Sequence, residues 1–123
     1  MRTILVADDE RALKMLIVET LKIGNYNILE VDNGLDALEL AGREKPDLAI
    51  LDVMMPGLTG YEVCKQIKTD PGLKQIKVLI LTAKGQQADK EAAKLALADY
   101  YISKPFSPME LLLKVEEILG DDK

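Results

Sequence analysis

Five side chains whose chemistry suits phosphate stand at the ends of short apolar runs in the sequence: Asp8, Asp9, Asp52, Thr82 and Lys104. Carboxylates that converge on one place repel one another, so keeping them ionised together calls for a cation. Their oxygen atoms favour Mg²⁺, which binds one or two carboxylates and keeps several waters for a phosphate group. A carboxylate can also attack phosphorus and hold the phosphoryl group covalently. The set therefore predicts phosphoryl transfer assisted by Mg²⁺.

Asp52 is the best-placed nucleophile of this set. It directly follows an apolar run, where an aspartate without a partner would be costly to bury. Lys104 offers a positive charge, and Thr82 offers a hydroxyl donor, for the charge that spreads over the phosphoryl oxygens during transfer. The chain contains no histidine, which removes the commonest general base and excludes a histidine phosphodonor.

The same residues also have structural interpretations that carry no chemistry. Asp8 and Asp9 could cap a helix, because acidic side chains favour a helix amino terminus. Thr82 could be an ordinary β-branched strand residue, and Lys104 could be a solvated charge before a turn. Taken singly, neither Thr82 nor Lys104 separates the two interpretations.

Short runs of apolar and β-branched residues predict the strands that position these side chains. The five runs are Ile4 to Ala7, Ile28 to Val31, Leu48 to Val53, Val78 to Thr82 and Tyr100 to Ser103. The third and fourth runs are apolar nearly throughout rather than alternating, as central strands of a parallel sheet covered on both faces are.

Segments of helical period alternate with the strands and complete the predicted fold. They are Leu13 to Leu21, Leu35 to Ala41, Val63 to Ile67, the Ala-rich stretch Ala88 to Leu97, and Leu111 to Ile118. Five β-α units with right-handed crossovers predict an α/β fold, a three-layer (βα)5 sandwich. In such open sheets ligands bind beyond the carboxyl ends of the strands, which is where the five polar side chains stand.

Composition limits the alternatives. The 123 residues suit one domain, so we expect a single domain over 1–123 with no effector domain in this chain. A net charge of -5 argues against direct binding of nucleic acid. The single cysteine, Cys64, and the early acidic residues fit a cytoplasmic protein with no signal peptide and no membrane contact.

Four sequence blocks follow one another at the predicted strand ends: ILVADDE, LAILDVMMPGLTG, VLILTA and YYISKPFSP. In order and spacing they resemble the signature blocks of response regulator receiver domains of two-component signalling systems, among them the chemotaxis regulators. The resemblance spans essentially the whole chain. It implies a flavodoxin-like fold whose parallel five-stranded sheet has the order 2-1-3-4-5, and a switch activated by phosphorylation.

The resemblance also assigns roles within the site. Asp52 would accept the phosphoryl group from a sensor histidine kinase or a histidine phosphotransfer protein. Asp9 would bind Mg²⁺ directly and Asp8 mainly through water, and Asp52 would also belong to the metal site. The backbone carbonyl of Met54 would complete the protein's metal ligands. The backbone N–H groups of Met54 and Ala83 would donate to the phosphoryl oxygens.

A switch pair is implied as well. Thr82 would move toward the modified aspartate, and Tyr101 would turn inward to fill the space left by Thr82, as a shift between two packings. Lys104 would contact the phosphoryl group, and the bond before Pro105 would be cis. The face of the fourth helix, fifth strand and fifth helix would pass the change to a downstream protein target or to an effector domain.

Four positions depart from the family pattern. Met54 and Lys84 stand where the family tunes loss of the phosphoryl group, and neither suits the orientation of an attacking water, which predicts slow autodephosphorylation. Leu97 and Tyr100 stand where the family often has a glycine and an acidic residue. The shape of the turn before the fifth strand therefore needs a structure to define it.

Three other functions compete with the switch. A hydrolase that uses an aspartyl phosphate would want a second acid at the position of Met54. A nucleotide-binding module would want a Gly-rich loop after the first strand, and the sequence has none there. A scaffold without chemistry would not need the intact polar set. We therefore expect a signalling domain that promotes only its own phosphotransfer and autodephosphorylation, not an enzyme for outside substrates, and the sequence leaves open whether it acts alone or within a longer regulator.

Overall fold

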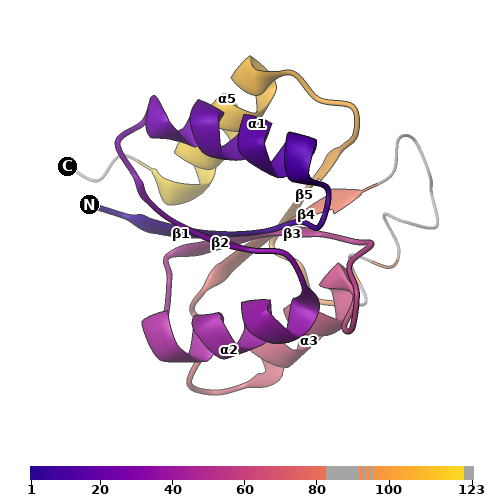
Figure 1. The fold of residues 1–123 in the computed structure, drawn as a ribbon. Helices are drawn as coiled ribbons and strands as arrows, with labels where there is room; N and C mark the ends of the chain where they lie inside the picture. Colours follow the sequence, from indigo (N-terminus) through magenta and orange to yellow (C-terminus); the bar gives the residue numbers. More distant parts are fainter. Residues whose placement is uncertain (83–91, 93, 95, 121–123) are drawn as a thin grey trace.

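The computed structural model describes every residue except 83–91, 93, 95 and 121–123. Its strands and helices alternate along the chain (Figure 1). The elements are β1 (Thr3–Ala7), α1 (Arg11–Lys22), β2 (Asn27–Val31), α2 (Gly34–Glu44), β3 (Leu48–Asp52), α3 (Gly60–Thr69), β4 (Lys77–Thr82), β5 (Tyr100–Ser103) and α5 (Pro108–Leu119). All five predicted strands are present, although β3 ends one residue before the predicted Val53.

The five strands form one parallel sheet in the order β2-β1-β3-β4-β5. Helices α1 and α5 cover one face of the sheet, and α2 and α3 cover the other (Figure 1). The structure therefore confirms the predicted three-layer α/β sandwich and its strand order. The order reverses between β1 and β3, and this is the place where open α/β sheets bind their ligands.

The core has two halves, one on each face of the sheet. Side chains alternate along each strand, so Leu5 of β1 and Leu51 of β3 pack under α2 and α3, whereas Ile4 and Ile50 pack under α1 and α5. All five residues of β3 are buried. Truncation of a large core side chain to alanine costs roughly 2–5 kcal/mol, so the central strands hold their carboxyl ends firmly in place.

Local capping explains where two of the helices begin. Thr59 and Glu62 form a reciprocal capping box at the start of α3, and Ser107 and Glu110 form another at the start of α5. Pro108 stands in the first turn of α5, where its missing N–H costs nothing. These caps fix the helices that follow the third and fifth strands.

The predicted fourth helix, Ala88 to Leu97, lies largely outside the described residues. Within that range Ala92 and Lys94 are helical, and Ala96 and Leu97 form a turn that leads into β5. None of the four helices bounded in the described part of the chain has the length and apolar character needed to cross a membrane.

Candidate functional site

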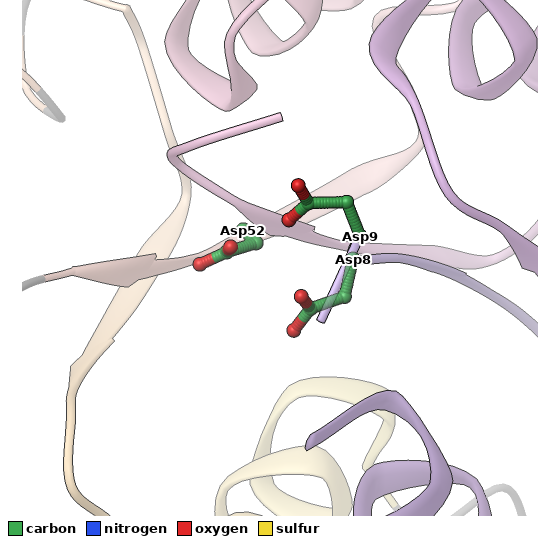
Figure 2. A group of neighbouring side chains, drawn as sticks. All are labelled: Asp8, Asp9 and Asp52. Atoms are coloured by element: carbon green, nitrogen blue, oxygen red, sulfur yellow. The ribbon is translucent and has the colours of Figure 1, made fainter. Parts of the chain in front are cut away.

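Three aspartates meet at the carboxyl edge of the sheet (Figure 2). Asp8 and Asp9 follow β1, and Asp52 is the last residue of β3, its neighbour in the sheet. One carboxylate oxygen from each lies within 4.8 Å of the others. Asp9 is exposed, whereas Asp8 and Asp52 are buried. The parallel pairing of β1 and β3 therefore brings together residues that stand more than forty positions apart.

Asp8 carries the clearest sign that a ligand belongs here. One of its oxygens, Oδ1, accepts a hydrogen bond of 2.9 Å from the backbone N–H of Glu10. The other, Oδ2, is buried and has no hydrogen-bond partner. A buried oxygen without a partner is costly and rare, so its presence calls for a bound water or ion.

Burial also raises the pKa of Asp8, from its ordinary value of 3.8 to about 6. The nearby charge of Asp52 acts in the same direction, while the hydrogen bond from Glu10 opposes it. The structure thus contains the repulsion that was expected among converging carboxylates. A divalent cation would relieve it, and the oxygen-only donor set suits Mg²⁺.

Asp8 and Asp9 do not act as caps of the kind that the alternative interpretation required. The N-cap residue of α1 is Glu10, and its side chain makes no capping hydrogen bond. Asp8 does accept from the Glu10 backbone, but this uses only one of its two oxygens. Helix capping therefore explains at most one of the four carboxylate oxygens of Asp8 and Asp9.

A short ion pair joins Asp52 to β5. The Lys104 ammonium lies 2.6 Å from Asp52 Oδ1, and the Asp52 side chain is only 5% exposed. The backbone N–H of Lys104 donates to the carbonyl of Thr82 over 2.8 Å, which fixes the chain just past β5 against β4. The Lys104–Pro105 peptide bond is cis. Lys104 thus delivers a positive charge to the buried aspartate.

Thr82 and Tyr101, the predicted switch pair, stand on adjacent strands. The Thr82 side chain is buried, and its hydroxyl donates over 3.4 Å to the backbone carbonyl of Ile102. Tyr101 is 40% exposed and pairs with Ile80 of β4 in the register of the sheet. In this arrangement the threonine hydroxyl is bonded to β5, and the tyrosine ring is partly in solvent.

The loop after β3 brings its backbone close to Asp52. A Cβ atom at Gly60 would collide with the carbonyl oxygen of Asp52, so only glycine fits there. Gly57 has a φ of +80°, a conformation that favours glycine as well. The side chain of Met54 is 73% exposed, and its backbone belongs to this loop. Ala83, the other predicted backbone donor, lies outside the described residues.

The sequence prediction missed an ordered contact at the opposite edge of the sheet. Lys68, in the last turn of α3, lies 2.8 Å from Asp99, which directly precedes β5. Neither residue stood out in the sequence, because a lysine near a helix end and an aspartate near a turn are ordinary surface features.

A groove of about 450 Å³ adjoins the site on the α1 side. It is lined by Leu13 and Leu16 of α1 and by Lys104, Pro105 and Phe106 of the segment that follows β5. Apart from the lysine its lining is apolar. The charged site therefore continues into an apolar surface.

The chain matches the response regulator receiver domain family over residues 4–116. The match includes β1 from Ile4, the whole of the other four strands, and the three aspartates. The chain therefore belongs to this family, which confirms the resemblance seen in its sequence blocks.

Individual proteins show the same relationship. The alkaline phosphatase synthesis transcriptional regulatory protein PhoP of Bacillus subtilis is 42% identical over 118 residues, which cover 96% of this chain and 48% of PhoP. The chain spans about half the length of the curated transcriptional regulators it matches.

Solved structures agree with the fold. The chemotaxis response regulator CheY4 of Vibrio cholerae superposes with a TM-score of 0.89 at 29% identity, covering 96% of this chain and 98% of CheY4. The receiver domain of sensor histidine kinase PA1611 from Pseudomonas aeruginosa PAO1 superposes with a TM-score of 0.89 at 27% identity, covering 98% of each chain. That structure has a magnesium ion coordinated in its active site cleft.

Proposed function

We propose that this receiver domain accepts a phosphoryl group on Asp52 from a phosphohistidine, with Mg²⁺ bound beside it, and that the modified domain changes the partners it binds. The observation that carries the proposal is the surroundings of Asp52. It is buried, it touches Lys104 at 2.6 Å, and it lies beside two further carboxylates. A purely structural aspartate needs a partner, but it gains nothing from two carboxylates that repel it.

Asp8 and Asp9 are the residues that would hold the metal with Asp52. The unpartnered Oδ2 of Asp8 supports this role, as does the coordinated magnesium in the related PA1611 receiver domain. The backbone carbonyl of Met54, in the loop after β3, would add a fourth protein ligand. When bound, Mg²⁺ would supply positive charge to the phosphoryl oxygens and to the carboxylates.

The chemistry we propose is a single displacement at phosphorus. An Asp52 oxygen forms the new O–P bond while the N–P bond of the phosphohistidine breaks, and the leaving imidazole keeps the electron pair of that bond and takes up a proton. Lys104 is placed to neutralise charge on the transferring oxygens, and the backbone N–H groups of Met54 and Ala83 would donate to them. No outside substrate is turned over, and hydrolysis would return the domain to its starting state.

The change in binding would follow from Thr82 and Tyr101. A phosphoryl group on Asp52 offers new acceptor oxygens, so the Thr82 hydroxyl could exchange its 3.4 Å bond to Ile102 for a stronger charged one. The half-exposed Tyr101 would then move inward. This would alter the face around β5 and α5 that a downstream protein or a linked effector domain reads.

We place the phosphodonor on the apolar groove beside Lys104. Leu13, Leu16 and Phe106 line it, and it opens next to the aspartate that must be reached. A helix that carries the phosphohistidine could bury apolar side chains there while presenting its imidazole to Asp52. The groove would then contribute affinity, and the charged site would contribute the chemistry.

We also propose that the phosphoryl group is lost slowly. The exposed side chain of Met54 can shield the site but cannot orient a water for attack. Lys84, the second residue behind this hypothesis, lies outside the described residues. A lifetime of only seconds for the modified isolated domain would contradict it.

The experiment is to incubate the domain with a small acyl phosphate and Mg²⁺ and to follow the intact mass. We expect a gain of one phosphoryl group in the wild type and none in Asp52→Asn. Asp36→Asn, a change of an exposed aspartate in the first turn of α2, is the matched control and should gain the group normally. A gain that persists in Asp52→Asn would move the acceptor elsewhere.

A further inference from the structure

A second lysine–aspartate contact fixes the amino end of β5, and every N–H of its lysine has an acceptor. The Lys68 ammonium donates to the carbonyls of Lys74 and Ile76 over 2.8 and 2.9 Å, and to Asp99 Oδ2 over 2.8 Å. The same Asp99 oxygen accepts the backbone N–H of Val78 over 2.8 Å. We call this set the Lys68–Asp99 clamp, after its two charged residues. It joins the end of α3 and the start of β4 to the residue that precedes β5.

The turn held by the clamp has a strained backbone. Leu97 has a φ of +69°, in the left-handed region where a side chain is disfavoured and glycine is not. Its neighbour Ala96 is bonded to α3, since its carbonyl accepts from the Cys64 thiol over 3.3 Å. Burial raises the pKa of Cys64 to about 12, so the thiol keeps the proton that it donates. Bonds on both sides of Leu97 thus hold it in a conformation that it would otherwise leave.

Strand β5 is short and is held by its pairing with β4, by the buried Ile102 and by contacts at its two ends. It spans only Tyr100–Ser103, and among the described strands it pairs with β4 alone. Its carboxyl end is held by Lys104, through the backbone bond to Thr82 and the ion pair with Asp52. The strand therefore has one lysine–aspartate contact at each end. Lys104 can reach the reacting group in one geometry only if the strand behind it keeps its register.

We infer that Lys68 and Asp99 are positioning residues for phosphoryl transfer, which act by holding β5 so that Lys104 contacts Asp52. The inference rests on the proposed function and goes beyond it, because the clamp touches none of the site residues. Without the clamp, strain at Leu97 would favour a different turn and β5 would loosen from its amino end. Lys104 would then meet Asp52 in a range of geometries, and transfer depends on accurate placement.

The test measures the initial rate of phosphoryl gain from a small acyl phosphate with saturating Mg²⁺, by intact mass, at a temperature where circular dichroism shows every variant folded. Lys68→Met should lower the rate by at least about threefold, and Lys68→Arg should restore it. Lys22→Met removes an exposed ion pair to Glu19 on α1 and should leave the rate unchanged.

Two double variants separate positioning from general loosening. In the Lys104→Met background, Lys68→Met should cause no further loss of rate, because the residue through which the clamp acts is gone. In the Lys68→Met background, Leu97→Gly should recover part of the rate, because glycine adopts the required turn without strain. A clamp that only stabilises the fold would slow transfer equally with and without Lys104.

Each outcome separates this inference from the proposed function. If the wild type gains no phosphoryl group, the proposed function fails. If the wild type is modified but the Lys68→Met variant is modified equally fast, the inference alone is overturned. The same holds if Lys68→Met slows transfer as much in the Lys104→Met background as it does in the wild type. Should Lys68→Met not fold, Asp99→Asn replaces it. The amide oxygen at position 99 can still accept from Val78, but the charge is lost. We expect a smaller decrease in the rate of phosphoryl gain, with the same dependence on Lys104.

Discussion

Two lysine–aspartate pairs lie at opposite edges of the same sheet. The distances between ammonium nitrogen and carboxylate oxygen are nearly equal, but the groups around each pair differ. Lys68 and Asp99 lie 2.8 Å apart, and Lys104 and Asp52 lie 2.6 Å apart. Each ammonium N–H of Lys68 has an acceptor, and Asp99 also accepts a backbone N–H. At the other edge Lys104 pairs with Asp52, which lies beside two further carboxylates, and an oxygen of Asp8 has no partner. The lysine of the first pair has no donor left for a ligand, whereas the second pair lies where a cation and a phosphoryl group could bind.

One fold thus keeps a structural ion pair and a reactive one at opposite edges of its sheet. A lysine whose three N–H groups all have acceptors contributes to a unique structure and has no donor left for a ligand. A pair set among surplus like charges costs stability, and binding of a ligand can recover that cost.

The largest effect on stability should come from Lys68→Met. It removes three hydrogen bonds and leaves Asp99, whose side chain is 24% exposed, without its counter-charge, which should lower the free energy of unfolding by about 2–3 kcal/mol in urea titrations. Added Mg²⁺ should not repair this loss. Lys104→Met should instead give a loss that Mg²⁺ reduces, since the cation can replace the missing charge. Equal responses of the two variants to Mg²⁺ would remove the distinction between the pairs.

The next effect is a pH dependence that arises from Asp8. Its pKa is about 6 in the folded protein and near 3.8 in an unfolded chain, so between these values the folded state binds more protons. The free energy of unfolding contributed by Asp8 should therefore fall as the pH rises from about 4 to about 6, by about 2–3 kcal/mol. Asp8→Asn should lack this component when the two unfolding curves are subtracted. A difference that is flat across this range would show that Asp8 is not under the strain described.

Metal binding should give a smaller gain in the same region. Mg²⁺ at ten times its Kd should raise the free energy of unfolding by about 1.4 kcal/mol, since it binds only the folded site. Thermal unfolding with and without Mg²⁺ measures this gain. Asp9→Asn should reduce it strongly, whereas Asp36→Asn, on the neighbouring helix, should preserve it. A gain that survives Asp9→Asn would place the ion elsewhere.

The smallest effect on stability concerns the strained turn beside the Lys68–Asp99 pair. Leu97→Gly should stabilise the domain by about 0.5–1 kcal/mol, because glycine meets the φ of +69° without the penalty paid by leucine. The gain should be visible as a small rise in the denaturant midpoint. Gly42→Ala, a change in α2 where a Cβ meets no other atoms, is a control that should stabilise through helix propensity alone. A loss on Leu97→Gly would mean that leucine packing outweighs the strain.

The two regions also differ in how far a sequence predicts them. Asp52 could be identified because it interrupts an apolar run and the ends of parallel strands meet at one edge, so residue type and position suffice. Asp8 and Asp9 follow from the same rule. The sequence could not predict that Asp8 would be left with a free oxygen, because this depends on how the turn into α1 directs the Glu10 N–H.

The Lys68–Asp99 pair has no comparable signal in the sequence. Lys68 and Asp99 are separated by 31 positions, and each has the type and place of an ordinary surface residue. Their partners are mostly backbone carbonyls and N–H groups, which no residue pattern marks. A departure from the family pattern at Leu97 did point to the turn beside them, but only its backbone angle shows the strain.

Phosphorylation of Asp52 is tested most directly by locating the acceptor atom chemically. The modified domain would be reduced with borohydride, which converts an aspartyl phosphate to homoserine, and then digested and sequenced by mass spectrometry. We expect homoserine at position 52 in a sample treated with acyl phosphate and Mg²⁺, and unchanged aspartate at positions 8, 9 and 99. Homoserine at another position, or none at 52 when the intact mass shows a phosphoryl group, would contradict this expectation.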